Sequence, residues 1–430
     1  MSVPSKHIVV LGAGFGGLEF CKAFRHPDAR ITLVDRHNHH LFQPLLYQVA
    51  TAGLSMPEIA QPIRSILSER RDITVLLDEA TDIRLAEKAV VLKNETLHYD
   101  YLLLALGAVT SYFGHEEWER HAHGLKSLDD ASAIRRDVLL AFERAESCND
   151  PQEQKKLMTS VVIGGGPTGV ELAGAFAELT RHVLKRDFRR INPAEARVVL
   201  VEAAPKVLVG FPDPLPDKAR RQLEKLGVEV RTSSPVKEIG PGYVRLENEA
   251  LYAANIVWAA GVMAHPITRS LDVDLDRAGR IKIRPDCSLP GYPEAFAVGD
   301  IAWLVDARQR TVPGVSPAAM QMARHVARII KTELMGAPCV PTQRPAFSYF
   351  DKGSMATIGR SAAVAVIGKI QLTGWFAWLA WLFVHLIFLV GLRNKLAVLL
   401  QWFYSYVRYK RGARIITGEL PDKFFSTRLP

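Results

Sequence analysis

Two short glycine-rich segments have the residue types and the spacing that bind the pyrophosphate of a dinucleotide. The first is Gly12-Ala13-Gly14-Phe15-Gly16-Gly17, and the second runs from Gly164 to Gly169. In such a G-x-G-x-x-G turn, the first glycine allows the tight bend, the second leaves room for the phosphates, and the third lets the following helix pack closely against the strand. The N-terminus of that helix adds unpaired N–H groups and the positive end of a dipole. Both segments are therefore candidate dinucleotide-binding turns.

An acidic residue follows each turn at the place where a nucleotide ribose is expected. Asp35 comes 23 residues after Gly12, and Glu202 comes 38 residues after Gly164. Each acid ends a predicted strand, where a carboxylate accepts hydrogen bonds from the ribose hydroxyls and repels a 2′-phosphate. The two acids favour an unphosphorylated ribose, so the second turn is expected to take NADH rather than NADPH. A solvated loop charge is the alternative for either residue.

The elements around both turns follow the order of a βαβ unit: strand, glycine turn, helix, strand, acid. A helical excursion from Arg181 to Arg190 accounts for the longer spacing in the second unit. Because the turns lie about 150 residues apart, they indicate duplicated domains rather than a solenoid, whose period is roughly 20–50 residues. The predicted strands are residues 7–11, 31–34, 101–107, 160–163, 198–201, 256–261 and 295–298.

The composition is that of a folded protein with one unusual end. Hydrophobic residues make up 48 % and charged residues 23 % of the 430 residues, which argues against disorder, collagen and coiled coil. Residues 391–430 hold eight basic and two acidic side chains, and so carry +6 of the net charge of +9. A local basic patch that faces something anionic explains this charge better than nucleic-acid binding, so no nucleic-acid partner is expected.

Cysteine usage excludes several kinds of site. The four cysteines lie far apart, without a C-x-x-C pair or a Cys/His cluster. No metal site, disulfide framework or dithiol redox centre is therefore expected, which fits a reducing compartment. The N-terminus leads straight into a predicted strand, so no secretory signal is expected either.

Several longer segments resemble the two-dinucleotide-binding flavoproteins and, within them, the type II NADH dehydrogenases, the single-subunit NADH:quinone oxidoreductases. The resemblance covers nearly the whole chain. It implies an α/β fold with two Rossmann-like, glutathione-reductase-like domains and a C-terminal membrane-associating helical region. The segments that carry it are Asn38–Gln48, Gly164–Glu178, Trp258–Val262, Val298–Asp300, Asp351–Arg360 and Arg411–Arg414.

The resemblance also implies the cofactors and the domain limits. FAD is expected in residues 1–115 and 275–345, NADH in residues 116–274, and membrane anchoring with possible dimerisation in residues 346–430. Asp300 resembles the aspartate that binds the ribityl chain of FAD, for which a simple turn after a strand is the alternative. The residues expected to bind FAD are Gly12, Ala13, Gly14, Phe15, Gly16, Gly17, Asp35, Arg36, Gly107, Asp300 and Ala319. Those expected to bind NADH are Gly164, Gly166, Gly169, Glu202 and Gly261.

Glu171, in the first turn of the predicted second helix, is the catalytic residue that the resemblance implies. It is expected near the flavin and the nicotinamide, where it handles protons in quinone reduction or orders water and substrate. The alternative is a carboxylate that stabilises a helix N-terminus, worth about 0.3–1 kcal/mol. No Cys pair lies near either turn, and no haem or iron–sulfur ligand set is visible, so the acceptor must reach the flavin directly.

Gln321 and Lys352 are implied on the quinone side. Many members of the family carry Ala-Gln-x-Ala-x-Gln, which aligns here with Ser316-Pro317-Ala318-Ala319-Met320-Gln321. The second Gln is kept, but the first is Pro317, which cannot donate a hydrogen bond. The way in which quinone is held is therefore expected to differ. A solvated surface lysine is the alternative for Lys352.

The apolar run of residues 374–392 contains no formal charge and reaches about the 20 residues that span a bilayer. Tryptophan recurs through it at spacing three, although tryptophan prefers the membrane interface. A second run, residues 396–407, holds Trp402, Phe403, Tyr404 and Tyr406 and leads into Arg408, Lys410 and Arg411. Aromatic residues beside a basic cluster are typical of an interfacial helix on anionic lipid. The resemblance implies monotopic attachment through this region. A membrane span and a buried core or dimer helix are the alternatives.

Together these patterns predict a peripheral flavoenzyme on the cytoplasmic face of the inner membrane. It would oxidise NADH, pass two electrons through FAD to a membrane quinone without pumping protons, and form a homodimer. Two rival interpretations remain. One is a soluble NADH-dependent reductase of another acceptor, and the other is a nucleotide-binding scaffold flavoprotein with little turnover.

Overall fold

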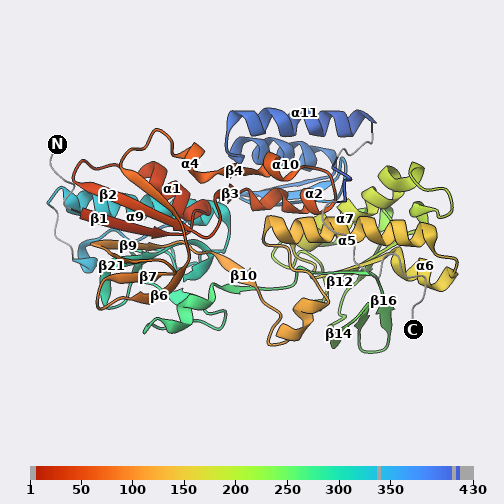
Figure 1. Ribbon diagram of the computed structural model, residues 1–430, viewed down its shortest axis with the longest axis horizontal. Coiled ribbons are helices and arrows are strands. Elements are labelled where there is room, and N and C mark those ends of the chain that lie inside the picture. The colour runs from red at the N-terminus through yellow and green to blue at the C-terminus, as the bar shows by residue number, and fades with distance from the viewer. Residues whose placement is uncertain (1–5, 337–339, 409–412, 417–430) are drawn as a thin grey trace. The chain divides into compact units, whose positions relative to one another are not determined.

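The computed structural model describes residues 6–336, 340–408 and 413–416 of the chain. The chain forms two compact units, each built around a largely parallel sheet (Figure 1). The first unit comprises the residues up to Leu41, Ala60–Val109 and Val262–Lys352. The second unit comprises Phe42–Ile59, Thr110–Gly261 and the residues from Gly353 onward.

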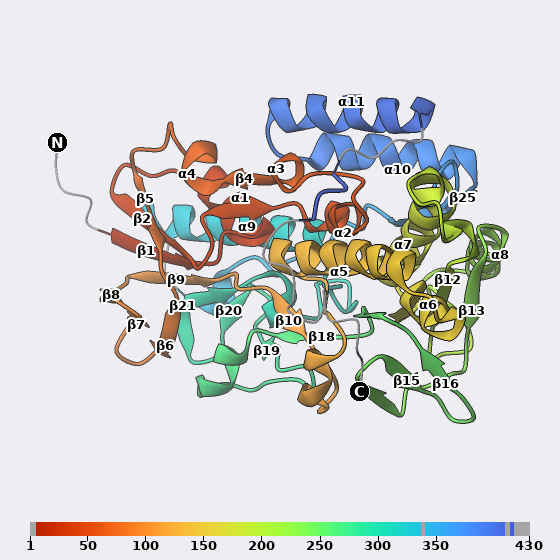
Figure 2. The ribbon, with the colours of Figure 1, turned by 45° about the vertical axis from the view of Figure 1, so that its right-hand side comes forward.

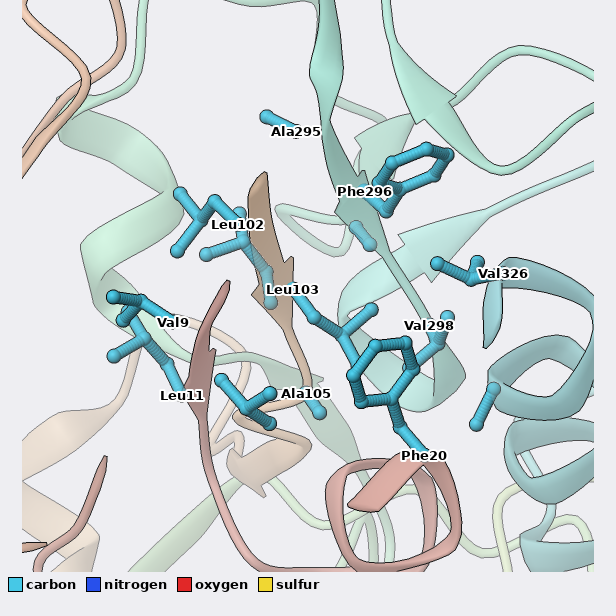
Figure 3. Packing of buried hydrophobic residues seen from close by; sticks show 14 of the residues in the cluster. Val9, Leu11, Phe20, Leu102, Leu103, Ala105, Ala295, Phe296, Val298 and Val326 are labelled. Carbon is cyan, nitrogen blue, oxygen red and sulfur yellow. The ribbon is translucent and has the colours of Figure 1, made fainter. Parts of the chain in front are cut away.

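A six-stranded sheet forms the centre of the first unit. All its neighbouring strands are parallel except the first pair. The order is β20 (Ser288–Leu289), β21 (Tyr292–Ala297), β9 (Tyr101–Leu104), β1 (Lys6–Leu11), β2 (Ala29–Asp35), β5 (Ile73–Leu77). The continuous apolar run Ile8–Leu11 is buried, as expected of a parallel strand covered on both faces. Figure 3 shows side chains from β1, β9 and β21 meeting Phe20 of α1 (Phe15–Ala23) and Val326 of α9 (Ser316–Leu334) in this core.

The second unit repeats this arrangement. Its four strands are all parallel, in the order β13 (Val228–Arg231), β12 (Arg197–Val201), β11 (Thr159–Ile163), β17 (Asn255–Trp258). This is the order of β5, β2, β1 and β9, with β11 in the place of β1. Helix α7 (Pro167–Glu178) follows β11 as α1 follows β1. The duplicated βαβ unit predicted from the two glycine turns is confirmed.

Smaller elements complete each unit. Three antiparallel sheets have three strands each: β6 (Ala80–Arg84), β7 (Ala89–Leu92), β8 (Thr96–His98); β14 (Glu238–Gly240), β15 (Tyr243–Arg245), β16 (Ala250–Tyr252); and β23 (Ser354–Thr357), β24 (Ala363–Ile367), β25 (Ile370–Thr373). The short strand pairs are β3 (His39–Leu41) with β4 (Ala60–Pro62), β19 (Ile281–Lys282) with β22 (Ala302–Trp303), and β10 (Ala108–Thr110) with β18 (Val262–Ala264).

The remaining helices are mostly in the second unit. Its longer helices are α5 (Leu128–Ser147), α6 (Pro151–Leu157) and α8 (Leu215–Lys225), and its short turns are η1 (Gln43–Leu45), α2 (Leu46–Ala50), α3 (Met56–Ile59) and η2 (Glu116–Arg120). The first unit adds α4 (Ile63–Ile66), η6 (Pro266–Ser270), η7 (Gly299–Ile301) and η8 (Pro341–Gln343). The helical excursion predicted for residues 181–190 is irregular, with a π-helical turn η3 (Leu179–Val183), a 3-10 turn η4 (Leu184–Arg186) and then η5 (Pro193–Glu195).

Two helices near the C-terminus lie side by side in both Figures 1 and 2, where they are drawn in blue. They are α10 (Trp375–Phe388) and α11 (Leu392–Arg408), joined by a turn in which Gly391 has a φ of +84°. The apolar run of residues 374–392 therefore contains a 14-residue helix followed by a turn. Among the helices described, none is both long and apolar enough to cross a membrane. Lys410 and Arg411 of the predicted basic cluster, and the side chain of Arg408, lie outside the described residues.

The compact units group the chain differently from the domain limits predicted from the sequence, which stay a prediction. The described residues from Gly353 onward are grouped with the second unit, and so are residues 42–59. The reason is side-chain packing between distant segments. The indole of Trp402 donates to Oε1 of Gln48 at 2.8 Å, and the rings of Tyr47 and Trp381 lie 6.5 Å apart.

Candidate active site

The first glycine turn is closed on its inner side and open at its middle glycine. Gly12 has a φ of +96°, which favours glycine, and a Cβ there would overlap the Ala105 carbonyl group. A Cβ on Gly17 would overlap the carbonyl oxygen of Gly12. A Cβ on Gly14, in contrast, would meet no atom within 4 Å. The backbone around Gly14 is thus available to phosphates, as the dinucleotide prediction requires.

The second turn has the same construction. Gly164 has a φ of +111°, and a Cβ there would lie 2.6 Å from Ala259. A Cβ on Gly169 would overlap the carbonyl oxygen of Gly164, whereas a Cβ on Gly166 would meet nothing within 4 Å. Both turns therefore have the shape that receives a pyrophosphate at the start of a helix.

The two acids that follow these turns hold them in shape. The N–H of Ala13 donates to Asp35 at 2.6 Å, and the N–H of Gly165 donates to Glu202 at 2.5 Å. Burial acts to raise the pKa of Asp35, but hydrogen bonds from His37 and Ala13 outweigh it and lower that pKa, so the residue is a carboxylate. Each carboxylate oxygen keeps a second lone pair for a ribose hydroxyl.

His40 is an unexpected feature beside the first turn. Its Nδ1–H donates to the carbonyl oxygen of Ala13 at 2.9 Å, and its ring packs edge-on against Phe15. Burial lowers the pKa of His40 to about 4, so the ring is neutral and Nε2 is an acceptor. This Nε2 is fully buried and has no hydrogen-bond partner in the described part of the chain. An acceptor in this state suits a hydroxyl group of a bound nucleotide and not its phosphate oxygens, which are themselves acceptors.

Gly299, which directly precedes Asp300, lies against Ala319 where η7 adjoins the start of α9. Gly299 has a φ of +76°, and a Cβ there would lie 3.0 Å from the Cβ of Ala319. The carboxylate of Asp300 accepts no hydrogen bond from the described residues, so it can accept from a ribityl hydroxyl. Pro317 lies in the first turn of α9, where a backbone N–H has no partner within the helix. The departure from the family's Ala-Gln pattern therefore costs this helix no hydrogen bond.

Three further predicted residues differ in their surroundings. Gly107, past the end of β9, has a φ of +69°, and a Cβ there would meet no atom within 4 Å. The side chain of Arg36 is half-exposed and lies 4.0 Å from Glu79. In the second unit, a Cβ on Gly261 would overlap the ring of Phe113.

The side-chain amide of Gln321 is held by the backbone of the segment that leads to Lys352. The amide of Gln321 donates to the carbonyl oxygen of Phe350 at 2.9 Å and accepts from its N–H at 3.0 Å. Gln321 therefore fixes the backbone two residues before Lys352, whose side chain is exposed.

Glu171 is the fifth residue of α7 and is buried, with 8 % of its surface exposed. Its Oε1 accepts two hydrogen bonds, from the N–H of Thr357 and from the indole N–H of Trp381, both at 3.2 Å. Neither donor belongs to α7 itself, so the alternative of a simple helix-terminus charge does not describe this carboxyl group. Strand β23 and helix α10 bring the two donors to it.

Burial raises the pKa of Glu171 to about 8, although the hydrogen bonds from Thr357 and Trp381 act to lower it. The group is therefore a neutral acid at pH 7 and can give a proton to a substrate. Its surroundings are aromatic: Trp381 stacks on His385 with ring centres 4.0 Å apart and contacts Trp402 at 5.6 Å. Burial also lowers the pKa of His385 to about 4, so no positive charge from that ring stabilises a carboxylate.

A chain with two such turns and a buried acid directly after the second belongs to the class of pyridine-nucleotide oxidoreductases. Residues 6–323 match the family model described as pyridine nucleotide-disulphide oxidoreductase, and residues 352–408 match that of the NDH2 C-terminal domain. The chain is 44 % identical to the type II NADH:quinone oxidoreductase Ndh of Mycobacterium tuberculosis, over 99 % of this chain and 93 % of that protein. The protein therefore belongs to the type II NADH:quinone oxidoreductase family.

Two further relatives agree with this assignment. The NdhA enzyme of the same bacterium, also named type II NADH:quinone oxidoreductase, is 42 % identical over 97 % of this chain and 91 % of its own length. The solved structure of NDH2 from Plasmodium falciparum in complex with NADH has the same fold, with a TM-score of 0.86. It covers 95 % of this chain and 99 % of that chain at 21 % identity.

The sequence interpretation missed three residues that the structure places in the sites. His40 and Thr357 lie inside segments that carried the family resemblance, but only the folded chain shows an unpartnered nitrogen or a backbone donor. Trp381 was grouped with the interfacial aromatics. Steps of three residues rotate by about 300° on a helix, so Trp375 and Trp381, two such steps apart, point in directions that differ by about 120°. Trp375 is accordingly 49 % exposed, whereas Trp381 is 1 % exposed.

Proposed function

We infer that the protein oxidises NADH and reduces a membrane quinone by two electrons, without pumping protons. It binds FAD at the first turn and NADH at the second. When bound, FAD supplies the transfer of an electron pair between the two substrates. The observation that carries the inference is the pair of equivalent open glycine turns in one chain, together with a neutral buried acid that directly follows the second turn.

An anaerobic titration tests both half-reactions on the full chain purified in detergent. NADH is added while the flavin absorbance is followed, and a short-chain quinone is added afterwards. Bleaching by NADH and recovery of the absorbance with quinone are expected. If NADH bleaches the flavin and quinone does not restore its absorbance, the electron acceptor is not quinone. If NADH does not bleach the flavin, NADH is excluded as the electron donor.

The residues at the sites are part of this proposal. Asp35, Asp300 and the first turn would hold FAD, and Glu202 with the second turn would hold NADH. Glu171 would donate a proton to the reduced quinone. Gln321 would hold the segment that presents Lys352 to quinone.

Gly166→Val is expected to weaken NADH binding and leave FAD in place. A valine is compatible with the φ of −69° and ψ of 179° at this position, and its side chain would fill the space left for the pyrophosphate. We expect KM for NADH to rise at least about tenfold, since the loss of one or two phosphate hydrogen bonds costs about 1.5–3 kcal/mol. The matched variant Gly14→Val should lose FAD instead. An unchanged KM in Gly166→Val would exclude the second turn as the NADH site.

His40→Phe is expected to weaken FAD binding about tenfold, because a hydroxyl donor of the nucleotide would lose its acceptor. The dissociation constant is measured by flavin fluorescence on protein that has been stripped of FAD and reconstituted. His98→Phe, an exposed histidine of the same unit, serves as the control and should leave the constant unchanged. Equal affinities in the two variants would show that Nε2 of His40 has no partner in FAD.

Attachment to a membrane surface, dimerisation and the cytoplasmic face complete the proposal. Helices α10 and α11 expose a set of large apolar side chains, here called the apolar face: Trp375, Phe376, Leu379, Phe383, Ile387, Leu392, Leu396, Leu399, Leu400, Phe403 and Tyr404. So many exposed apolar side chains on neighbouring helices are typical of a lipid or protein interface. The basic residues of the C-terminal segment support anionic lipid as the partner of this face.

A further inference from the structure

We propose that Trp381 is a positioning residue for Glu171: its indole N–H and the N–H of Thr357 hold Oε1, so that the acid presents Oε2 and its proton to the substrate. This inference rests on the proposed proton-donating role of Glu171. It assigns a part in the chemistry to helix α10, which otherwise carries only the proposed membrane contact.

The geometry of the carboxyl group supports this assignment. Both donors reach the same oxygen at 3.2 Å, and Oε2 has no hydrogen-bond partner among the described residues. An oxygen that accepts two N–H groups must keep its lone pairs, so the proton of the neutral acid resides on the other oxygen. Two donors from two elements therefore determine both the rotation of the carboxyl group and the site of its proton.

The position of Trp381 is itself fixed on several sides. Its ring stacks on His385, whose Nδ1–H donates to the Trp381 carbonyl oxygen at 2.8 Å. Tyr47 and Trp402 contact its ring from α2 and α11. The indole cannot swing away without displacing these neighbours, so the donated hydrogen bond is pre-organised.

The titration of Glu171 depends on few other groups. His385 is neutral at physiological pH, and the pKa of Glu171 reflects its burial and these two donors rather than a nearby charge. Since the Trp381 bond favours the carboxylate, removing it should raise the pKa of Glu171 further. The decline of kcat at high pH should then move upward by about half to one pH unit, which corresponds to one hydrogen bond.

The test compares Trp381→Phe with the unaltered enzyme, with a water-soluble quinone as acceptor. We expect the upward shift of the pH profile and a kcat at pH 7 lowered about three- to tenfold, because the proton is less well directed. The rate of flavin reduction by NADH should stay unchanged. Trp378→Phe, one turn earlier on the same helix and stacked on Tyr406, is the matched control and should retain the original profile.

A second variant separates the hydrogen bond from the packing. Replacing Trp381 by 3-benzothienylalanine keeps the ring shape and removes only the N–H donor. The same pH shift in this variant supports the inference, and an unshifted profile overturns it even if Trp381→Phe folds poorly. If Glu171→Gln is itself without effect, the proposed role of Glu171 fails. If Glu171→Gln is impaired but both Trp381 variants behave normally, only the positioning role fails.

Discussion

Glu171→Gln is expected to lower quinone-dependent turnover by about 100-fold, the lower end of what a positioned general acid contributes. The amide keeps the size of the side chain and an oxygen that accepts from Thr357 and Trp381. It cannot supply a proton. Because burial raises the pKa of Glu171 to about 8, the unaltered enzyme should lose activity as the pH rises through that value. The variant should be slow at every pH and lack this decline.

Steady-state rates between pH 6 and pH 10, with bound FAD measured in the same samples, check this expectation. Glu178→Gln is the matched control, since Glu178 lies on the same helix and is equally buried at 8 % exposed. Its kcat should stay within about twofold, as expected of a residue outside the reaction. A Glu171→Gln enzyme that turns over normally and keeps its decline near pH 8 would show that another group delivers the proton.

Removing the apolar face is expected to release the protein from membranes. In the variant, Phe376, Phe383, Leu400 and Phe403 are changed together to Ser. Each of these side chains is between 66 % and 69 % exposed. Burying one such side chain in an apolar environment contributes about 1.5–3 kcal/mol. The partition onto vesicles should therefore fall by at least about 1,000-fold, while NADH oxidation with a water-soluble quinone continues.

Sedimentation with vesicles of neutral lipid, and of neutral lipid mixed with anionic lipid, measures this partition. Leu77→Ser combined with Val209→Ser is the control, because both side chains are at least 60 % exposed and neither belongs to α10 or α11. That variant should sediment like the unaltered protein. Retention of the fourfold variant on vesicles would assign the apolar face to another contact, such as a second copy of the chain.

The βαβ units could be predicted from the sequence because each is local. A strand, a glycine turn and a helix lie within about 25 residues, and their periodicity is directly visible. Strand β1 has the predicted end at Leu11, and the order of elements around Gly164 is as expected. Asp35 and Glu202 could likewise be placed beside their glycine turns from the sequence, and their role with a ribose stays a prediction.

The surroundings of Glu171 could not be predicted in this way. Its donors come from β23 and α10, more than 180 residues away in the chain, and no local pattern reports such contacts. For the same reason, residues 42–59 were expected with the FAD-binding part, whereas they pack in the second unit. The role of Gln321 was inferred from resemblance, and its bonds to the backbone of Phe350 appear only in the folded chain.

The buried acid also affects the stability of the protein. A free glutamate has a pKa of 4.5, whereas that of Glu171 is about 8, so between these values the folded chain holds one proton more than the unfolded chain. The free energy of unfolding therefore falls by about 1.4 kcal/mol for each unit by which the pH rises across this range, counting this group alone. The total free energy of unfolding of natural proteins is only about 5–15 kcal/mol. The position whose replacement would remove this loss of stability is thus the one proposed to give its proton to quinone, so stability and activity make opposite demands on a single residue.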